Sequence, residues 1–176
     1  MRQAIIALLL VGCWLPAQTA QAASDVEVAG DILQVLIPSI GFGATLYLDD
    51  DQGRDQFLQS FASTVVITQV LKYSINRERP NGGSQSFPSG HTSAAFQGAA
   101  FIHARFGLSY AIPAYIGAAF VGYSRVESNK HYNSDVFAGA LIGSLSAFYF
   151  SDPYNGISMQ PKASQSGYGA QLSVAW

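Results

Sequence analysis

The sequence has little charge. Asp, Glu, Lys and Arg make up 11% of its 176 residues, whereas soluble proteins average about 25%. Its 9 Lys and Arg residues and 11 Asp and Glu residues leave a net charge of −2, which argues against the basic surface of a nucleic-acid-binding protein. The 49% hydrophobic content excludes a disordered chain. These proportions indicate an apolar protein that is either a compact helical bundle or embedded in a membrane.

Cysteine is almost absent as well. Cys13 is the single cysteine of the sequence, so the chain can form no internal disulfide and has no cluster of thiolates to hold zinc. A length of 176 residues leaves no room for a second domain of ordinary size. We therefore expect one domain without a thiolate metal site.

The amino terminus has the features of an export signal. A short positive start, an apolar run over residues 4–15 and small residues at Ala20 and Ala22 fit a signal peptide that is cleaved after residue 22. An uncleaved first membrane helix is the alternative, and residues 10–13 also resemble a bacterial lipobox. Each interpretation has the chain exported from the cytoplasm. We expect a signal peptide or first membrane helix over residues 1–22, a helical domain over 23–152 and a polar tail over 153–176.

Apolar segments separated by short polar corners predict an all-α bundle of about five core helices. The expected helices cover residues 32–48, 56–71, 92–106, 109–123 and about 133–150. Asp31 is expected to lie just before the first helix, Gly53 to break the chain in the acidic corner 49–55, and Gly107 to end the third helix. Residues 171–176 alternate like a strand but have no obvious partner.

The lengths of the apolar segments bear on the choice between membrane and water. Four stretches of 16 to 19 residues carry no charge, and a spanning helix needs about 20 apolar residues. A buried bundle gives the same pattern, but the low total charge favours a membrane. Alternating helices then place the loops at 72–88 and 124–135 on the periplasmic side. The inward corner 49–55 is acidic, contrary to the positive-inside rule.

The few cations are concentrated in two short segments. Residues 72–79 and 125–130 hold five of the eight Lys and Arg residues that follow the signal. Two of the three histidines, His91 and His131, lie beside these segments. Arg offers a planar pair of donors to two oxygens and Lys adds a point charge, so the pattern indicates a site for a multiply charged anion such as phosphate.

The segment around His91 adds backbone donors to this site. Ser89, Gly90 and His91 lie at the start of an expected helix, where free N–H groups favour an anion and Gly90 permits close approach. Taken alone, Pro88-Ser89-Gly90-His91 is more typical of a turn and helix cap than of an anion site.

The two histidines suggest a division of catalytic roles. His131 and Asp135 are four residues apart and would share a helix face. A carboxylate that holds one ring nitrogen leaves the other free to attack phosphorus. His91 has no carboxylate at that spacing, which suits it to donate a proton to the leaving group. An ordinary i,i+4 pair is the alternative for His131 and Asp135. Arg77 and Glu78 are expected to support the loop, and His103 receives no role.

Three spaced motifs resemble the signature of the type 2 phosphatidic acid phosphatase and vanadium haloperoxidase superfamily. They are Lys72 with Arg79-Pro80; Pro88-Ser89-Gly90-His91; and Ser124-Arg125 with His131 and Asp135. All three occur in order, and no signature position departs from the pattern. The resemblance implies an all-α fold with the active site in loops at one end. It also implies phosphate binding by Lys72, Arg79 and Arg125, with Ser89 and the Gly90 backbone assisting.

The same resemblance implies a mechanism that needs no metal or cofactor. His131 would be the nucleophile that forms a phosphohistidine, Asp135 its orienting partner and His91 the acid. The expected activity is hydrolysis of a phosphomonoester or pyrophosphate, with vanadate as an inhibitor. The preferred substrate is a membrane lipid of the phosphatidic acid, phosphatidylglycerophosphate or undecaprenyl pyrophosphate type.

Two other functions remain open on the sequence. The first is a soluble periplasmic acid phosphatase of broad specificity, which the signal peptide favours. The second is a non-catalytic oxyanion-binding module, which would have no use for His91 and His131. The preferred interpretation places the protein in a bacterial inner membrane with its active site facing the periplasm.

Overall fold

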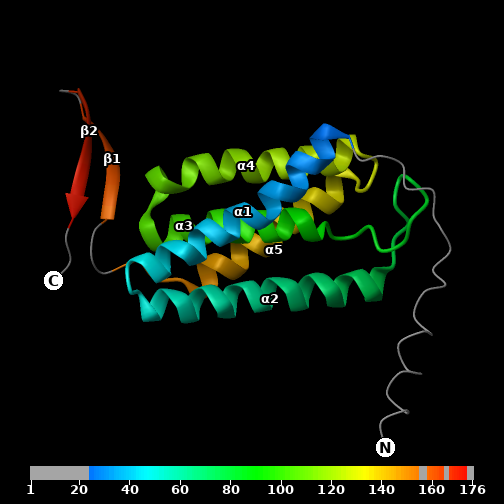
Figure 1. Cartoon of the computed structure of the whole chain (residues 1–176), viewed down its shortest axis with the longest axis horizontal. Helices are drawn as coiled ribbons and strands as arrows, with labels where there is room; N and C mark the ends of the chain where they lie inside the picture. The colour runs from blue at the N-terminus through cyan, green and yellow to red at the C-terminus, as the bar shows by residue number, and fades with distance from the viewer. Residues whose placement is uncertain (1–23, 155–157, 165–166, 174–176) are drawn as a thin grey trace, which may run out of the picture.

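The computed structural model describes residues 24–154, 158–164 and 167–173. Five helices, α1 (Asp25–Tyr47), α2 (Asp51–Ile75), α3 (Gly90–Phe106), α4 (Leu108–Glu127) and α5 (Asn133–Phe150), precede two strands, β1 (Ser158–Ser164) and β2 (Gly167–Ser173). The helices run along one common long axis (Figure 1). The predicted all-α bundle of five core helices is confirmed. The signal or first membrane helix expected over residues 1–22 lies outside the described residues.

Helix α3 occupies the centre of the bundle and packs against each of the other four helices. Most side chains that it buries are small, and Ala95, Ala99 and Ala100 have no exposed surface. The larger Phe101 meets the ring of Phe57 edge-on, with the two ring centroids 5.0 Å apart. Small side chains let four neighbours approach one helix, because the backbones can then lie close together.

Glycine makes the contact between α3 and α5 unusually close. A Cβ atom added at Gly143 of α5 would overlap the carbonyl oxygen of Ser93 in α3. A Cβ atom at Gly98 of α3 would lie 2.6 Å from backbone atoms of Pro38 in α1. Such contacts leave no room for a larger side chain. They therefore fix the position of α3 relative to α1 and α5. The first residue of α3 lies at the candidate site.

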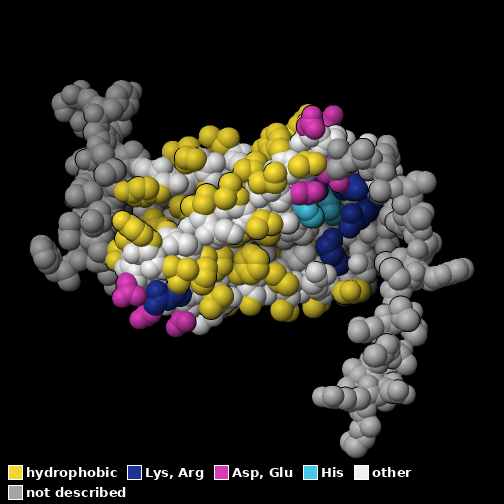
Figure 2. Space-filling model, in the orientation of Figure 1, with side chains coloured by type: hydrophobic (Ala, Val, Ile, Leu, Met, Phe, Trp, Pro, Cys, Tyr) yellow, Lys and Arg dark blue, Asp and Glu magenta, His cyan; other side chains and the backbone are white. Residues whose placement is uncertain are grey.

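The bundle interior contains polar side chains beside its small apolar core, while many large apolar side chains lie outside. The interior holds Ser60, Thr68 and Gln97 in buried positions, and the Gln97 side-chain amide donates to the Ser60 hydroxyl at 2.8 Å. Many large apolar side chains lie on the outer surface, and Ile116 and Leu145 are 68% and 66% exposed. Figure 2 shows apolar side chains along the flank of the bundle and charged ones gathered at its two ends. Within the described residues, α1 is the one helix long and apolar enough to cross a membrane.

A buried ion pair closes the end of the bundle away from the predicted site residues. The Arg105 guanidinium of α3 donates through Nε to Asp50 at 2.8 Å and through Nη1 to the Asp152 carbonyl at 2.9 Å. Asp50 also caps α2 by accepting the Gly53 N–H at 2.9 Å. One side chain therefore joins the end of α3 to the start of α2 and to the segment that follows α5.

Several boundaries predicted from the sequence are wrong. Helix α1 begins at Asp25 because the Ser24 hydroxyl accepts the Glu27 N–H at 3.2 Å, so Asp31 lies within the helix and not before it. Gly53 does not break the chain, since the Asp50 cap starts α2 at Asp51. The helix end at Gly107 is confirmed, and its φ of 102° suits glycine.

Three further helices and the tail also differ from the prediction. Helix α2 continues to Ile75, α3 begins at Gly90 and α4 covers Leu108–Glu127, so each is longer than predicted. In the tail, β2 pairs with β1 in an antiparallel hairpin that places Leu172 opposite Met159. The strand partner that the sequence did not reveal therefore comes from the tail itself.

The close contact of α3 and α5 predicts opposite effects for two glycine substitutions. We expect Gly143→Ala to lower the free energy of unfolding by about 1–3 kcal/mol, because the methyl group must push the two helices apart. A Cβ atom at Gly43 of α1 would meet nothing within 4 Å, so Gly43→Ala should be neutral or stabilise the helix by up to about 1 kcal/mol. Unfolding in detergent followed by circular dichroism measures both; equal changes would contradict the packing described.

Candidate active site

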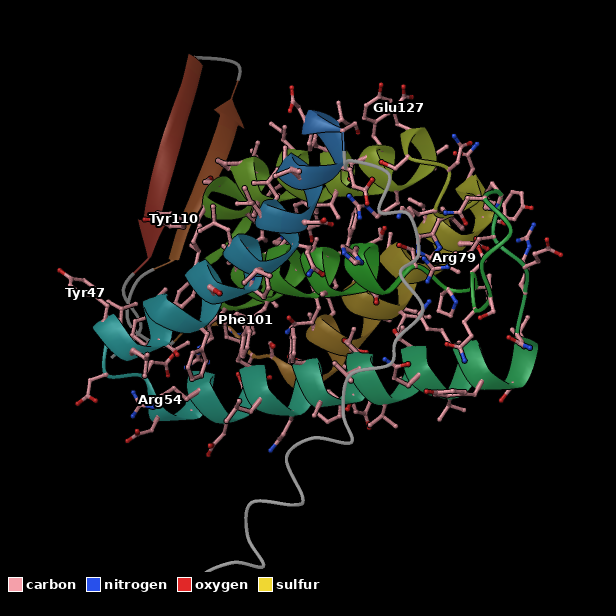
Figure 3. All side chains as sticks on the ribbon, turned by 45° about the vertical axis from the view of Figure 1, so that its right-hand side comes forward. Tyr47, Arg54, Arg79, Phe101, Tyr110 and Glu127 are labelled. Atoms are coloured by element: carbon pink, nitrogen blue, oxygen red, sulfur yellow. The ribbon has the colours of Figure 1, made fainter. Side chains whose placement is uncertain are left out.

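Side chains from four helices and two loops converge at one end of the bundle. Figure 3 shows Arg79 at the end where the α2–α3 and α4–α5 loops lie, opposite the end that carries Tyr47 and Arg54. A cavity of about 380 Å³ opens there. Its lining residues are Glu27, Asp31, Gln69, Lys72, Arg79, Gly90, His91, Arg125, Lys130 and His131. The three sequence motifs therefore contribute to a single cavity.

The charge of this cavity is positive. Four cations, Lys72, Arg79, Arg125 and Lys130, face two carboxylates, Glu27 and Asp31. An excess of two positive charges suits an anion of about two negative charges, which is the usual charge of a phosphate monoester near neutral pH. The cluster of cation and histidine side chains is visible at one end of the molecule in Figure 2.

Backbone carbonyls of the α2–α3 loop hold two of these cations. The Lys72 ammonium donates to the carbonyl of Gln85 at 2.8 Å, and Nε of Arg79 donates to the carbonyl of Ser84 at 2.9 Å. Neutral carbonyls fix the position of both side chains without cancelling their charge. Lys72 comes from the last turn of α2 and is buried, which strengthens its attraction for an anion in the cavity.

Arg125 is held differently, by groups of α1. Its Nη1 donates to Oδ1 of Asp31 at 2.7 Å and its Nη2 to the Glu27 carbonyl at 2.8 Å. The same Asp31 oxygen lies 3.1 Å from Nε2 of His91. His91 therefore has a carboxylate partner, although the sequence offers it none at the i,i+4 spacing. The sequence did not reveal the partner because it comes from a helix that is remote along the chain.

His131 lies in the loop between α4 and α5, directly in front of Asp135. Nδ1 of His131 is 3.7 Å from Oδ2 of Asp135, which is an ion-pair distance and too long for a hydrogen bond. This segment is not helical, so the pair does not arise from the shared helix face that the spacing suggested. Asp135 is completely buried behind the histidine, and it does not itself line the cavity.

Three donors fix the carboxylate of Asp135. Arg77 Nη1 donates to Oδ1 at 2.9 Å, while the Ser86 hydroxyl and the Tyr132 N–H donate to Oδ2 at 2.5 Å and 2.9 Å. The Arg77 guanidinium also lies over the Tyr132 ring, 4.1 Å from its centroid. The supporting role expected for Arg77 is thus located at Asp135, whereas nothing in the sequence pointed to Ser86.

Ser89 is placed differently from the prediction. Its hydroxyl caps α3, because it accepts the Thr92 N–H at 3.4 Å and shares a hydrogen bond of 2.9 Å with the Thr92 hydroxyl. Ser89 is completely buried and does not line the cavity. The neighbouring Gly90 does line it, so the start of α3 reaches the cavity through backbone and not through the serine side chain.

Burial and charge determine the protonation of His131. The ring is buried, and the nearby cations Lys72 and Arg79 repel a further positive charge. Together these effects lower the pKa of His131 to about 4. The imidazole is therefore neutral at ordinary pH and keeps a lone pair that can attack an electrophile. Among the described residues, no group of three or more His, Cys, Asp or Glu side chains is arranged to hold a metal ion.

Comparison with known sequences relates this arrangement to one family. The sequence model of the PAP2 superfamily matches residues 56–155. A lipid A 1-phosphatase of Porphyromonas gingivalis is 44% identical over 78 residues, which cover 42% of this chain and 18% of that protein. Lipid phosphate phosphatase 1 of Arabidopsis thaliana is 38% identical over 94 residues, which cover 42% of this chain and 28% of that protein. The chain therefore spans less than a third of the length of these relatives.

Two solved structures share the fold. LpxE of Aquifex aeolicus superposes with a TM-score of 0.55 at 22% identity over 70% of this chain and 90% of that one. The transmembrane PAP2 type phosphatidylglycerolphosphate phosphatase of Bacillus subtilis gives a TM-score of 0.55 at 30% identity over 71% of each chain. The helical arrangement described above is therefore shared with these two proteins.

The environment of His131 predicts its titration. We expect the imidazole signals of His131 in NMR spectra to change near pH 4, not near the ordinary value of 6.5. The unfolded chain takes up this proton first, so the free energy of unfolding should decrease as the pH falls from 6.5 towards 4. His131→Asn should remove that part of the pH dependence and identifies the signal. A His131 that titrates near 6.5 would contradict the burial described.

Proposed function

The chain belongs to the PAP2 superfamily, and on that basis we propose that it is a metal-independent phosphatase of membrane lipids that works through a phosphohistidine. The observation that carries this proposal is the convergence of Lys72, Arg79, Arg125, His91 and His131 on one cavity. A cavity that only bound an anion would need the cations, but it would have no use for a buried neutral imidazole beside them.

The first chemical step is transfer of the phosphoryl group to His131. The lone pair of its neutral ring attacks phosphorus while the bond from phosphorus to the leaving oxygen breaks. The leaving oxygen keeps that electron pair and takes a proton from His91. Lys72, Arg79 and Arg125 neutralise the remaining phosphate oxygens, which is the task of a metal ion in many other phosphatases. Asp135 stabilises the positive charge that develops on His131.

The second step releases phosphate. Neutral His91 removes a proton from a water molecule, and the water oxygen attacks phosphorus as the bond to His131 breaks. His131 returns to its neutral form and His91 to its protonated form, so both residues are ready for another cycle. Ser89 contributes by capping α3 and so fixing the backbone at Gly90, which approaches the phosphate. Vanadate resembles the five-coordinate phosphorus of both steps and should compete with the substrate.

The surface of the bundle supports a lipid substrate. Large apolar side chains cover its exterior, and many of its interior side chains are small or polar. This is the pattern of helices packed within a bilayer. Helix α1 is long enough to cross the hydrocarbon layer. We place the protein in a membrane, with the site end in the periplasm if the amino terminus is exported.

A groove between α1 and α2 provides a place for the lipid chains. It has a volume of about 370 Å³ and is lined by Gln34, Val35, Pro38, Ser39, Phe42, Phe57, Leu58, Phe61 and Ala94. Gln34 of α1 and Ala94 of α3 lie about one helical turn from Asp31 and His91 of the active site. A lipid can therefore place its phosphate in the cavity and its acyl chains in the groove.

The proposed mechanism predicts different losses for His131 and Lys72. With ³²P-labelled substrate and EDTA, rapid-quench trapping should give a labelled protein with the wild type and none with His131→Ala. Lys72→Ala should still form the phosphoenzyme but with KM raised about 10- to 100-fold, the value of a charged hydrogen bond. His103→Ala, at the other end of α3, is the control and should keep both properties. A labelled His131→Ala protein would contradict the mechanism.

The groove predicts a substrate-dependent effect of a bulky side chain. Val35→Trp should raise KM for a long-chain phosphatidic acid about tenfold or more, since the indole occupies the space of the acyl chains. KM for a small soluble phosphomonoester should change less than about twofold. Ile116→Trp places the same side chain on the exposed face of α4 and serves as the control. If Val35→Trp changed KM by the same factor for both substrates, a periplasmic acid phosphatase of broad specificity would be favoured instead.

A further inference from the structure

Asp31 of α1 connects two residues of the site that belong to different motifs. Its Oδ1 accepts from Nη1 of Arg125 at 2.7 Å and lies 3.1 Å from Nε2 of His91. None of the three motifs contains Asp31, and α1 lies outside the segment 56–155 that the family model matches. The carboxylate nevertheless lines the same cavity as both histidines.

The surroundings of His91 explain why a carboxylate is needed there. Arg125 of α4 and Arg79 of the α2–α3 loop line the cavity together with His91, as do Lys72 of α2 and Lys130 and His131 of the α4–α5 loop. Each of the cations disfavours a proton on the His91 ring. Asp31 and, one turn earlier on α1, Glu27 are the carboxylates that line the cavity. Glu27 pairs with Lys130 at 3.3 Å, so Asp31 is the carboxylate in direct contact with the ring.

We propose that Asp31 is the positioning residue of the proton donor and makes a second aspartate–histidine pair that complements His131 with Asp135. This inference rests on the proposed function, because it requires His91 to act as the acid. In the protonated ring both nitrogens carry hydrogen. Asp31 accepts the hydrogen on Nε2, which fixes the plane of the ring and stabilises its positive charge. The other ring proton is transferred to the leaving oxygen as its bond to phosphorus breaks, and His91 becomes neutral.

The two aspartates then act on opposite ends of the same reaction. Asp135 is buried and stabilises the charge that the nucleophile gains, whereas Asp31 stabilises the charge that the acid loses. Because Asp31 is carried by α1, the helix that also forms one wall of the groove, a shift of α1 relative to α3 would separate the acid from its partner.

Leaving groups of different basicity test this role. An alkyl phosphate such as a short-chain phosphatidic acid expels an alkoxide that needs a proton, while p-nitrophenyl phosphate expels a stable anion that needs none. We expect Asp31→Asn to slow single-turnover phosphoenzyme formation from the alkyl substrate about 10- to 100-fold. This is less than the whole rate contribution of an acid catalyst, because His91 itself is kept. The rate with p-nitrophenyl phosphate should change less than about threefold, which also shows that the variant is folded.

Two control variants separate the possible outcomes. Glu27→Gln removes one negative charge from the same cavity without touching His91 and should affect the two substrates equally. His91→Ala should show the selective loss of Asp31→Asn, only larger, and adding Asp31→Asn to it should cause no further selective loss. This absence of additivity is expected if Asp31 acts through His91.

Three results would overturn the inference. Equal losses on both substrates in Asp31→Asn would mean that Asp31 only supports the structure. A lower KM with unchanged phosphorylation rates would mean that its carboxylate merely competes with phosphate for Arg125. If His91→Ala itself showed no selectivity, the acid role of His91 would fail, and the inference would fail with it. The first two results leave the proposed function intact, so the two failures can be told apart.

Discussion

Attraction between one oxyanion and cations from separate parts of the chain is the interaction on which the proposed chemistry depends. Lys72, Arg79 and Arg125 come from the end of α2, the following loop and the end of α4, and they would repel one another without an anion between them. Backbone carbonyls hold Lys72 and Arg79 without neutralising them, while Asp31 holds Arg125. The cavity therefore keeps a positive charge that a phosphate can satisfy. Burial of the ring and the same positive charge together lower the pKa of His131 and keep it neutral, so the proposed phosphate-binding groups also help to prepare the proposed nucleophile.

The packing of the bundle makes this convergence possible. Small side chains on α3 and glycines on its neighbours bring the helix backbones close together, and α3 thereby carries Gly90 and His91 to the point where α2 and α4 end. Many large apolar side chains lie on the outside of the bundle. Exposing so much apolar surface to water would cost free energy, whereas in a bilayer the same side chains contact lipid tails that are equally apolar. One pattern of residue sizes thus serves both the geometry of the site and the proposed membrane environment.

The sequence predicted the parts that depend on local chemistry. Apolar runs located five helices, and Gly107 marked a helix end. The spacing of three motifs identified six of the residues that line the cavity: Lys72, Arg79, Gly90, His91, Arg125 and His131. It could not predict contacts between remote segments, such as Asp31 with His91 or Ser86 with Asp135, because no periodicity relates those positions. Gly53 misled for a related reason: a glycine is permissive in loops, but here Asp50 caps the helix and Arg105 holds that cap from another element. The Ser89 hydroxyl served the helix cap, which was the ordinary alternative for its motif.

A crystal structure with orthovanadate tests the central claim most directly, because vanadate reports both the attacking atom and the ligands of the oxyanion. We expect vanadium bonded to the ring nitrogen of His131 that is remote from Asp135, with its equatorial oxygens contacted by Lys72, Arg79 and Arg125. The apical oxygen opposite His131 should then lie within hydrogen-bonding distance of His91. Vanadate bound elsewhere, or bound by the cations with the His131 ring turned away from vanadium, would contradict that claim.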